Sequence, residues 1–306
     1  MIGTVTIVGA GALGTVIGDA IVKGIGPEKV RFLADGDRLA RCREKGVFYN
    51  GELCDFRFFD GSDAKPADLL IFGVKGPALE EAMELAASSV GPDTVILSLL
   101  NGISSEETLA QRFGWDKVLY TVTQGMDPVR EENTVVRRGS GGAIFVGVPQ
   151  EDYFDREEKL TETVDFLASV GLPVRREEDI LHRVWCKFMM NVGVNQACMA
   201  YETNYGGLQQ PGPAREAMLA AMNEARKIGA CQGVLLTQKD MKEYLTVLDR
   251  LDPTSIPSMR QDALAHRKTE VELFAGTVRS IAKRFGMQTP VNDTLYQIIH
   301  EMETNW

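Results

Sequence analysis

The sequence predicts an α/β fold in which a parallel β-sheet, covered by helices on both faces, precedes an all-helical domain. In the first half of the chain, short apolar runs rich in β-forming residues alternate with helical stretches. A glycine-rich turn connects the first apolar run to the first helix, and strand signals end near residue 177. Apolar strands that alternate with helices are typical of a buried parallel sheet. We therefore predict one domain over residues 1–177 and a second over residues 178–306.

Turn residues and hydrophobic periodicity define the elements of the first domain. Asn50-Gly51 is a favoured two-residue turn, which predicts a hairpin over residues 48–59. Segments 134–136 and 143–148 are expected to add antiparallel strands. The remaining elements are strands at 4–8, 30–33, 69–73, 94–99, 118–123 and 173–175, and helices at 12–23, 78–88, 104–113 and 155–169.

The second domain is expected to contain helices alone. Gly206-Gly207 and Pro211-Gly212-Pro213 mark a loop after its first helix. Helical periodicity predicts helices at residues 178–201, 213–231, 238–249, 258–285 and 291–303.

Composition and charge exclude several classes of function. The net charge is -10 and the pI is near 5.0, which disfavours binding to a nucleic acid backbone but permits a small anionic substrate. The five cysteines include no Cys-x-x-Cys pair, and with three histidines no metal site is expected. No apolar run reaches membrane-spanning length, and the N-terminus lacks the features of a signal peptide. We expect a cytoplasmic protein with reduced thiols.

The glycine-rich turn predicts a site for a dinucleotide. It has the pattern G-x-G-x-x-G, follows a strand and opens a helix, which is the context that the motif requires. The first glycine permits a tight turn, the second a close approach of the diphosphate, and the third close packing of the helix. A glycine turn without a ligand is the simpler alternative. The expected contacts are Gly9, Ala10, Gly11, Ala12, Leu13 and Gly14.

The choice between NAD and NADP depends on the end of the second strand. Asp35 stands where an acidic side chain can bind the ribose hydroxyls of NAD and repel the 2′-phosphate of NADP. Asp35 could instead begin a turn or cap the next helix. Arg38, Arg41 and Arg43 are also near and could bind a phosphate. The sequence leaves both cofactors open.

An apolar helix with a polar stripe is the clearest candidate for the catalytic element. Residues 184–195 are apolar nearly all round, which indicates a buried helix. Lys187, Asn191 and Asn195 interrupt it at intervals of four residues and therefore lie on one stripe. Because buried polar groups are costly without partners, the stripe predicts a polar cleft. The alternative is an ion pair and two amides that connect neighbouring helices.

These features together resemble the ketopantoate reductase (2-dehydropantoate 2-reductase) family. The resemblance covers nearly the whole chain and rests on the glycine turn, Asn101-Gly102, the Lys-x3-Asn-x3-Asn helix, and the segment from Ser258 to Glu270. It implies a Rossmann domain followed by a helical domain like that of 6-phosphogluconate dehydrogenase. It also implies NAD(P)H-dependent reduction of ketopantoate to pantoate, a step of pantothenate and coenzyme A biosynthesis, by a monomer or homodimer.

The resemblance also implies roles for single residues. Lys187 would be the catalytic proton donor. Substrate contacts would come from Asn101, Asn191, Asn195 and Ser258, and from Asn204 if it replaces a family asparagine one position away. Cofactor contacts would come from Lys75, Asn101, Met126 and Glu270.

Some of these residues have simpler structural interpretations. Ser258 could only cap the helix that follows it, in a capping box with Gln261. Glu270 could pair with Arg267 on the same helix. Many family members carry an arginine where this chain has Ala34-Asp35, so the family preference for NADPH does not transfer directly.

Two other functions are compatible with the same motifs. The first is reduction of another 2-keto acid, or oxidation of a phosphorylated polyol, on the same architecture. The second is a dinucleotide-sensing protein without turnover, which would not need an ionisable stripe on a buried helix. A pure scaffold would leave the glycine turn unused.

Overall fold

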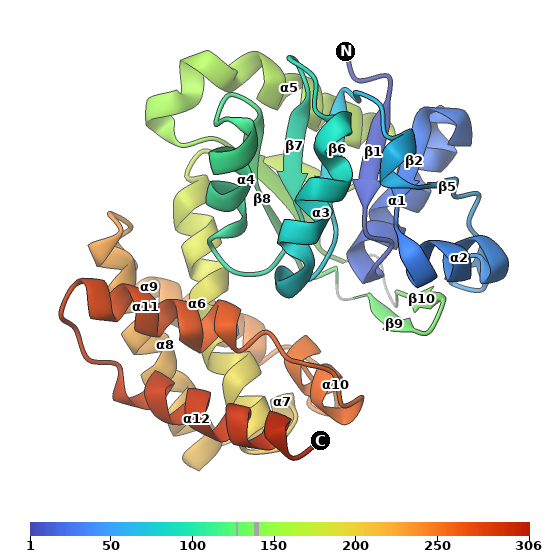
Figure 1. The fold of residues 1–306 in the computed structure, drawn as a ribbon. Coiled ribbons are helices and arrows are strands. Elements are labelled where there is room, and N and C mark those ends of the chain that lie inside the picture. Colours follow the sequence, from blue (N-terminus) through green and yellow to red (C-terminus); the bar gives the residue numbers. More distant parts are fainter. Residues whose placement is uncertain (127, 138–140) are drawn as a thin grey trace. The chain divides into compact units, whose positions relative to one another are not determined.

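The computed structural model describes residues 1–126, 128–137 and 141–306, and the chain divides into two compact units. Unit 1 is Met1–Leu181 and contains the sheets, whereas unit 2 is His182–Trp306 and is helical (Figure 1). The division falls inside one long helix, α6, which spans Ile180–Ala200.

The main sheet of unit 1 has the parallel arrangement that the sequence predicts. Its central strands pair in parallel, and the one antiparallel addition in the described part of this sheet is β11 against β8. In spatial order the strands are β12 (Val174–Arg176), β11 (Ala143–Gly147), β8 (Val118–Gln124), β7 (Val95–Ser98), β6 (Leu69–Phe72), β1 (Val5–Val8), β2 (Val30–Leu33) and β5 (Phe58–Phe59).

Helices cover this sheet on both faces. Successive strand residues point to opposite sides, so Val5 and Ile7 of β1 pack on one face and Val8 on the other. The first face is covered by α1 (Ala12–Ile25) and α5 (Tyr153–Ser169). The second is covered by α3 (Leu79–Ala86) and α4 (Ser105–Phe113), which lie together over one face in Figure 1. The predicted buried parallel sheet is therefore confirmed.

A second, four-stranded sheet corrects the sequence prediction for residues 48–59 and 134–136. The hairpin forms from β3 (Phe48–Tyr49) and β4 (Glu52–Leu53), with positive φ at Asn50 and Gly51. The hairpin contains only these two strands, because β5 pairs with β2 of the main sheet instead. Phe58 of β5 and the preceding Phe56 pack there on Phe32. Strand β10 (Thr134–Val136) is antiparallel to β9 (Val129–Glu131) but parallel to β3, and it lies outside the main sheet.

Unit 2 contains the predicted helices, with one exception. The single helix expected over 258–285 is wrong, because α10 ends at Leu264 and helical structure resumes with a π-helical turn at Glu272–Gly276. His266 has a positive φ, and the carboxylate of Glu303 holds the backbone N–H and the hydroxyl of Thr269 at 2.7 and 2.6 Å. The other helices are α7 (Tyr205–Gln209), α8 (Pro213–Cys231), α9 (Gln238–Leu248), α10 (Ser258–Leu264), α11 (Thr277–Arg284) and α12 (Pro290–Thr304).

Buried amides connect the helices of unit 2. The Nε2 group of Gln196 on α6 donates to Asn292 Oδ1 on α12 at 3.1 Å, and its Oε1 accepts from the backbone of Ala275 at 3.1 Å. Asn292 in turn donates to Glu224 on α8 at 2.8 Å. Gln196 and Asn292 are fully buried, so these bonds fix the helix packing that holds α6 in place.

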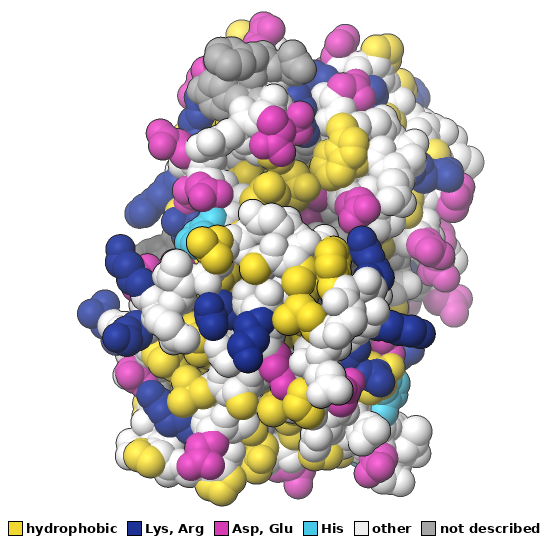
Figure 2. Space-filling view, turned by 90° about the vertical axis from the view of Figure 1, so that its left-hand side faces the viewer, with side chains coloured by type: hydrophobic (Ala, Val, Ile, Leu, Met, Phe, Trp, Pro, Cys, Tyr) yellow, Lys and Arg dark blue, Asp and Glu magenta, His cyan; other side chains and the backbone are white. Residues whose placement is uncertain are grey.

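The surface is mixed in character. Figure 2 shows one face, on which Lys and Arg side chains are interspersed with Asp and Glu and with scattered hydrophobic groups. None of the five cysteines, all of which lie in the described part, is in a disulfide. Within the described residues, no helix combines the length and the apolar character needed to cross a membrane.

A carboxylate fixes the start of β1, and its effect on stability should depend on pH. Asp68 Oδ2 accepts from the backbone N–H groups of Gly3 and Thr4, at 2.9 and 2.8 Å, and from the Thr4 hydroxyl at 3.0 Å. Burial raises the pKa of Asp68, but these hydrogen bonds outweigh it and lower the pKa below its usual value. The ionised form is therefore favoured in the folded state. Its stabilisation is present above the unfolded pKa and is lost as pH falls through the folded pKa.

We expect Asp68→Asn to lower the melting temperature at pH 7 by roughly 2–4 °C, which corresponds to about 1 kcal/mol in a domain of this size. The difference from wild type should shrink as pH falls from about 5 to about 2. Thermal unfolding across this pH range tests the prediction. A difference that stays constant with pH would contradict the role assigned to the charge.

Candidate functional site

The glycine turn has the close packing that its motif requires. Gly9 has φ of +99°, a conformation that side chains rarely adopt. A Cβ on Gly14 would lie 2.1 Å from the carbonyl oxygen of Gly9, so α1 can pack this closely only with glycine there. Ala10 is buried in the turn, and α1 begins at Ala12, followed by Leu13.

A further glycine that the sequence analysis did not select completes this turn. Gly73 directly follows β6, and a Cβ there would lie 3.0 Å from the carbonyl oxygen of Gly9. A Cβ on Gly11 would in turn lie 3.2 Å from the carbonyl oxygen of Gly73. The loops after β1 and β6 are therefore in backbone contact. A glycine directly after a buried strand was the available signal.

The start of α1 fits the diphosphate of a dinucleotide. Gly11 occupies the N-cap position without a side-chain cap, and the first turn contains no acidic residue. The backbone N–H groups and the positive end of the helix dipole therefore favour an anion. The absence of Cβ atoms at Gly9 and Gly11 lets the turn pack against Gly73 and keep this conformation.

The region after β2 combines Asp35 with a cluster of arginines. Asp35 occupies the N-cap position of α2 (Gly36–Lys45), but its exposed side chain makes no capping hydrogen bond. Arg43 is engaged elsewhere, since its guanidinium donates to the carbonyl of Phe58 at 2.9 and 3.2 Å. Arg130 on β9 is a residue that the sequence analysis missed. Burial, and after it the charges of Arg38 and Arg41, lower the pKa of Arg130, so these three cations lie near one another.

Three predicted site residues follow the carboxyl ends of adjacent parallel strands. Lys75 lies after β6 and is exposed, Asn101 lies after β7 and is partly buried, and Met126 lies after β8 and is buried. In open α/β sheets, ligands bind at this edge. The structure thus places the three residues at the same edge as the glycine turn. The Met126 carbonyl accepts a hydrogen bond from Arg137 Nε at 3.2 Å.

A buried hydroxyl pair supports the loop that carries Asn101. Ser98 ends β7 and donates to Ser105 Oγ at 2.8 Å, and Ser105 donates to the buried carboxylate of Glu106 at 2.8 Å. Ser98 Oγ also accepts from the backbone of Leu100 at 3.3 Å. These bonds fix both ends of the short loop.

The polar stripe on α6 forms a hydrogen-bonded chain that extends to α10. Asn195 Nδ2 donates to Asn191 Oδ1 at 3.3 Å, and Asn195 Oδ1 accepts from Ser258 Oγ at 3.4 Å and from the backbone of Met259 at 3.2 Å. Asn195 is buried, whereas Lys187 and Asn191 are partly exposed. The stripe therefore combines the two alternatives of the sequence analysis. Asn195 connects two helices, while Lys187 and Asn191 stay accessible to a ligand.

The capping box expected at Ser258 is not formed. Pro257 is the N-cap of α10, Ser258 is its first residue, and the Gln261 side chain donates to the Ile256 carbonyl instead. The oxygen that accepts from the N-terminus of α10 is Asn195 Oδ1, supplied from a different helix. Because Asn195 is far from α10 in the sequence, no local sequence pattern could predict this cap.

The remaining predicted site residues have local roles of their own. Arg267 pairs with Asp262 at 2.9 Å, and Glu270 is buried. Asn204 Oδ1 caps α7 by accepting from the backbone of Gly207 at 3.2 Å. The Nδ2 group of Asn204 takes no part in this cap.

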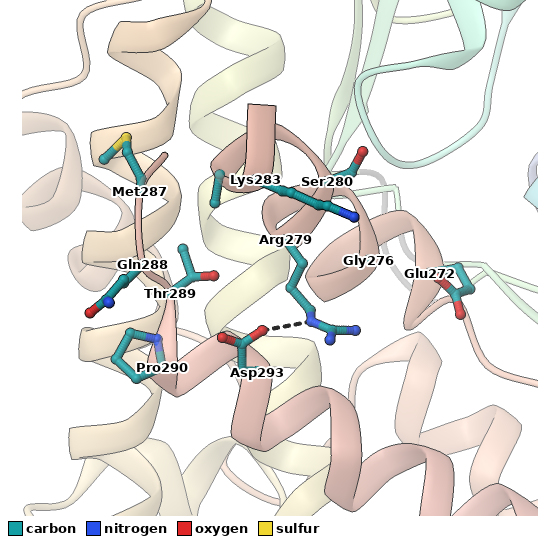
Figure 3. Close-up of a pocket in the computed structure, with 11 residues that line it drawn as sticks. Glu272, Gly276, Arg279, Ser280, Lys283, Met287, Gln288, Thr289, Pro290 and Asp293 are labelled. Carbon is teal, nitrogen blue, oxygen red and sulfur yellow. Dashed lines mark hydrogen bonds and ion pairs between the residues drawn. The ribbon is translucent and has the colours of Figure 1, made fainter. Parts of the chain in front are cut away.

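A groove of about 700 Å³ on α11 and α12 contains none of the predicted site residues. Figure 3 shows Arg279 and Asp293 facing each other across it, joined at 2.6 Å, and Lys283 beside them. Arg279 also lies over the ring of Tyr296, at 4.0 Å from its centroid. Because its central cation is already paired, we assign no ligand to this groove.

Comparison with known proteins settles the family. Residues 5–151 match the model described as ketopantoate reductase PanE/ApbA, and residues 179–303 match the model of the ketopantoate reductase PanE/ApbA C terminal. The chain belongs to the ketopantoate reductase family. It is therefore an oxidoreductase that acts on a keto group with a nicotinamide dinucleotide, on a Rossmann domain followed by a helical domain.

Relatives of this member of the ketopantoate reductase family align with almost the full length of the chain. The 2-dehydropantoate 2-reductase of Lactococcus lactis subsp. lactis (strain IL1403) is 26% identical, with 98% of this chain and 97% of the relative covered. That of Archaeoglobus fulgidus (strain ATCC 49558 / DSM 4304 / JCM 9628 / NBRC 100126 / VC-16) is 28% identical, with 98% of each covered. A solved structure of D-mandelate dehydrogenase with NADH and anilino(oxo)acetate superimposes with a TM-score of 0.86 and is 24% identical. The match covers 99% of this chain and 98% of that dehydrogenase.

Proposed function

We propose that the chain is a 2-dehydropantoate 2-reductase, which reduces ketopantoate to pantoate with NADPH or NADH. The observation that carries the proposal is the polar stripe of Lys187, Asn191 and Asn195 on α6, whose two amides are hydrogen-bonded to each other and to Ser258 on α10. A cation followed by amides and a hydroxyl suits a small anion that carries a carboxylate, a carbonyl and a hydroxyl. The relatives from Lactococcus lactis and Archaeoglobus fulgidus, both named 2-dehydropantoate 2-reductase, support this substrate.

In the proposed mechanism, each polar group of the stripe has one task. When bound, the reduced dinucleotide supplies a hydride to C2 of the keto acid. The Lys187 ammonium polarises the carbonyl and transfers a proton from Nζ to the carbonyl oxygen, so that the alkoxide becomes a hydroxyl. The accessible amide of Asn191 and the hydroxyl of Ser258 orient the substrate. Asn195 positions both of them through its hydrogen bonds.

The backbone of unit 1 would hold the cofactor. The glycine turn and the N-terminus of α1 would receive the diphosphate of the dinucleotide. The loops after β6, β7 and β8, which carry Lys75, Asn101 and Met126, would contact the remainder of the dinucleotide. Glu270 is buried in unit 2, and we retain it as a candidate contact to the cofactor.

A steady-state assay tests the substrate. The purified protein should oxidise NADPH or NADH with ketopantoate at a higher kcat/KM than with pyruvate, with a branched aliphatic keto acid or with an aromatic keto acid. A preference for another 2-keto acid would leave the reaction type intact but reject ketopantoate. Binding of the dinucleotide without turnover on any member of the panel would reject the reductase and favour a dinucleotide sensor.

The cofactor preference should respond to Asp35. We expect measurable use of NADH, because the Asp35 carboxylate is not used as a cap and can accept from the ribose hydroxyls. Asp35→Ala should raise the ratio of kcat/KM for NADPH to that for NADH by about 10-fold, since a hydrogen bond to a charged group contributes about 1.5–3 kcal/mol. Arg130→Gln should change the ratio in the opposite direction.

Asp37→Ala is the matched control, because it removes the same charge from the first turn of the same helix. It should leave the ratio within about 2-fold of wild type. A strong preference for NADPH that Asp35→Ala does not increase would contradict the role of Asp35.

A further inference from the structure

A cluster of three metal-ligating side chains lies in unit 2, away from the polar stripe. His182 and Cys186 lie one turn apart on α6, and Asp240 lies in the first turn of α9. One ligand atom from each lies within 4.8 Å of the other two. We propose that His182, Cys186 and Asp240 bind a single divalent cation of the zinc type. Cys186 precedes Lys187 and therefore lies about 100° around the helix from the stripe.

The distances from His182 to the other two ligands are close to those of an occupied site. His182 Nε2 lies 3.2 Å from Asp240 Oδ1, and Cys186 Sγ lies 3.7 Å from His182 Nδ1 and 3.8 Å from Nε2. Ligands at the usual 2.0–2.3 Å from a tetrahedral Zn²⁺ are themselves roughly 3.3–3.7 Å apart. To bind the ion, the imidazole turns so that one ring nitrogen faces the ion in place of the Asp240 carboxylate.

The carboxylate of Asp240 is already fixed in position. Its Oδ2 accepts from the backbone N–H and the hydroxyl of Thr237, at 2.6 and 2.7 Å, in the capping box of α9. This leaves Oδ1 on the side of His182. Such hydrogen bonds to the second oxygen orient a carboxylate ligand and raise metal affinity.

The ligand types select the class of cation. A thiolate with an imidazole and a carboxylate suits Zn²⁺, Co²⁺ or Cd²⁺, whereas Mg²⁺ and Ca²⁺ prefer oxygen alone. The His182 side chain is 34% exposed, so water can complete the coordination. On binding, the Cys186 thiol loses its proton to the buffer, and the neutral imidazole of His182 binds through one ring nitrogen and keeps its proton on the other, without any change of oxidation state.

Sequence patterns give little indication of this cluster. The spacing of His182 and Cys186 places both on one face of α6, as in helical motifs whose ligands are four residues apart. Asp240 comes from a helix that begins at Gln238, far along the chain. The alternative is that His182 and Asp240 share only a hydrogen bond, beside a buried thiol that packs as a small apolar group.

Titration of the metal-free, full-length protein with Co²⁺ and Zn²⁺ tests the proposal. We expect one equivalent of Co²⁺ to bind with a thiolate-to-metal absorption band, and Zn²⁺ to displace it and raise the melting temperature. Mg²⁺ should do neither. Cys186→Ser should abolish the band, and Asp240→Asn should weaken binding by at least about 10-fold. X-ray absorption of the Zn²⁺ protein should show one sulfur and two or more nitrogen or oxygen ligands.

Cys198→Ser is the matched control, because Cys198 is also a buried thiol on α6 and should not affect binding. His182→Gln, at a partly exposed position, serves as a second variant if Cys186→Ser does not fold. A Co²⁺ complex without a thiolate band, a band that persists in Cys186→Ser, or a Zn²⁺ spectrum without sulfur would overturn the proposal. These readouts do not depend on turnover, so they stay independent of the proposed reductase activity.

Discussion

Lys187→Ala is expected to lower kcat with ketopantoate by roughly 10²–10⁴-fold, the range that a positioned general acid contributes. The side chain is partly exposed on a helix that is mostly buried, and it precedes Asn191 by one turn on the stripe. Without the ammonium, the alkoxide that forms on hydride transfer has no proton donor on the stripe. The affinity for NADPH, measured by fluorescence titration, should change by less than about 2-fold, because the dinucleotide site that we propose is built on unit 1.

Two controls separate this effect from a general loss of structure. Lys227→Ala removes the same charge from an exposed position on α8 and should retain wild-type turnover. Circular dichroism and the melting temperature of Lys187→Ala should show that the variant is folded. Turnover close to that of wild type in a folded Lys187→Ala protein would remove Lys187 from the mechanism.

Asn191 and Asn195 occupy the same stripe, but their substitutions should differ in kind. Asn195 is buried and accepts from Ser258 and from the backbone of Met259, so it supports α10 as well as any substrate. Asn191 is partly exposed, and its oxygen accepts a hydrogen bond from Asn195. A periodic stripe alone predicts equal roles. The neighbouring helix, which the sequence does not place, makes them unequal.

Much of the fold could be predicted because its signals are local. The strands of unit 1 are short apolar runs, and the Asn50-Gly51 turn adopts the positive φ angles that its sequence favours. The errors occur where tertiary contacts override local pattern. Residues 265–271 continue a helical pattern, yet Glu303 on α12 holds Thr269 out of the helix. Phe58 leaves its hairpin because it pairs with β2 and packs on Phe32.

The candidate site shows the same division. The glycine turn and the polar stripe are compact patterns, and both could be selected from the chain alone. Gly73 had only its place after a buried strand as a signal, and Arg130 had none, because their importance arises from the packing of Gly73 on Gly9 and from the nearby charge of Arg38, which lie far away in sequence. The cluster of His182, Cys186 and Asp240 depends in the same way on the packing of α9 against α6.

Gly14→Ala is expected to weaken NADPH and NADH binding by roughly 10–100-fold, with a matching loss of kcat/KM. A Cβ at this position would lie 2.1 Å from the carbonyl oxygen of Gly9 and 3.3 Å from its carbonyl carbon, and both are backbone atoms that cannot rotate away. The turn must therefore open or α1 must shift. Overpacking of this kind costs about 1–3 kcal/mol, and here it displaces the N–H groups that would receive the diphosphate.

Gly3→Ala provides the matched control for this substitution. It adds the same methyl group just before β1, where the nearest atom is Asp68 Oδ2 at an ordinary 3.6 Å. This variant should keep both its melting temperature and its dinucleotide affinity, since neither the turn nor α1 is touched. If Gly14→Ala bound NADPH and NADH as tightly as Gly3→Ala does, the diphosphate could not depend on the close packing of α1 against the first strand. The cofactor site would then have to lie elsewhere on unit 1.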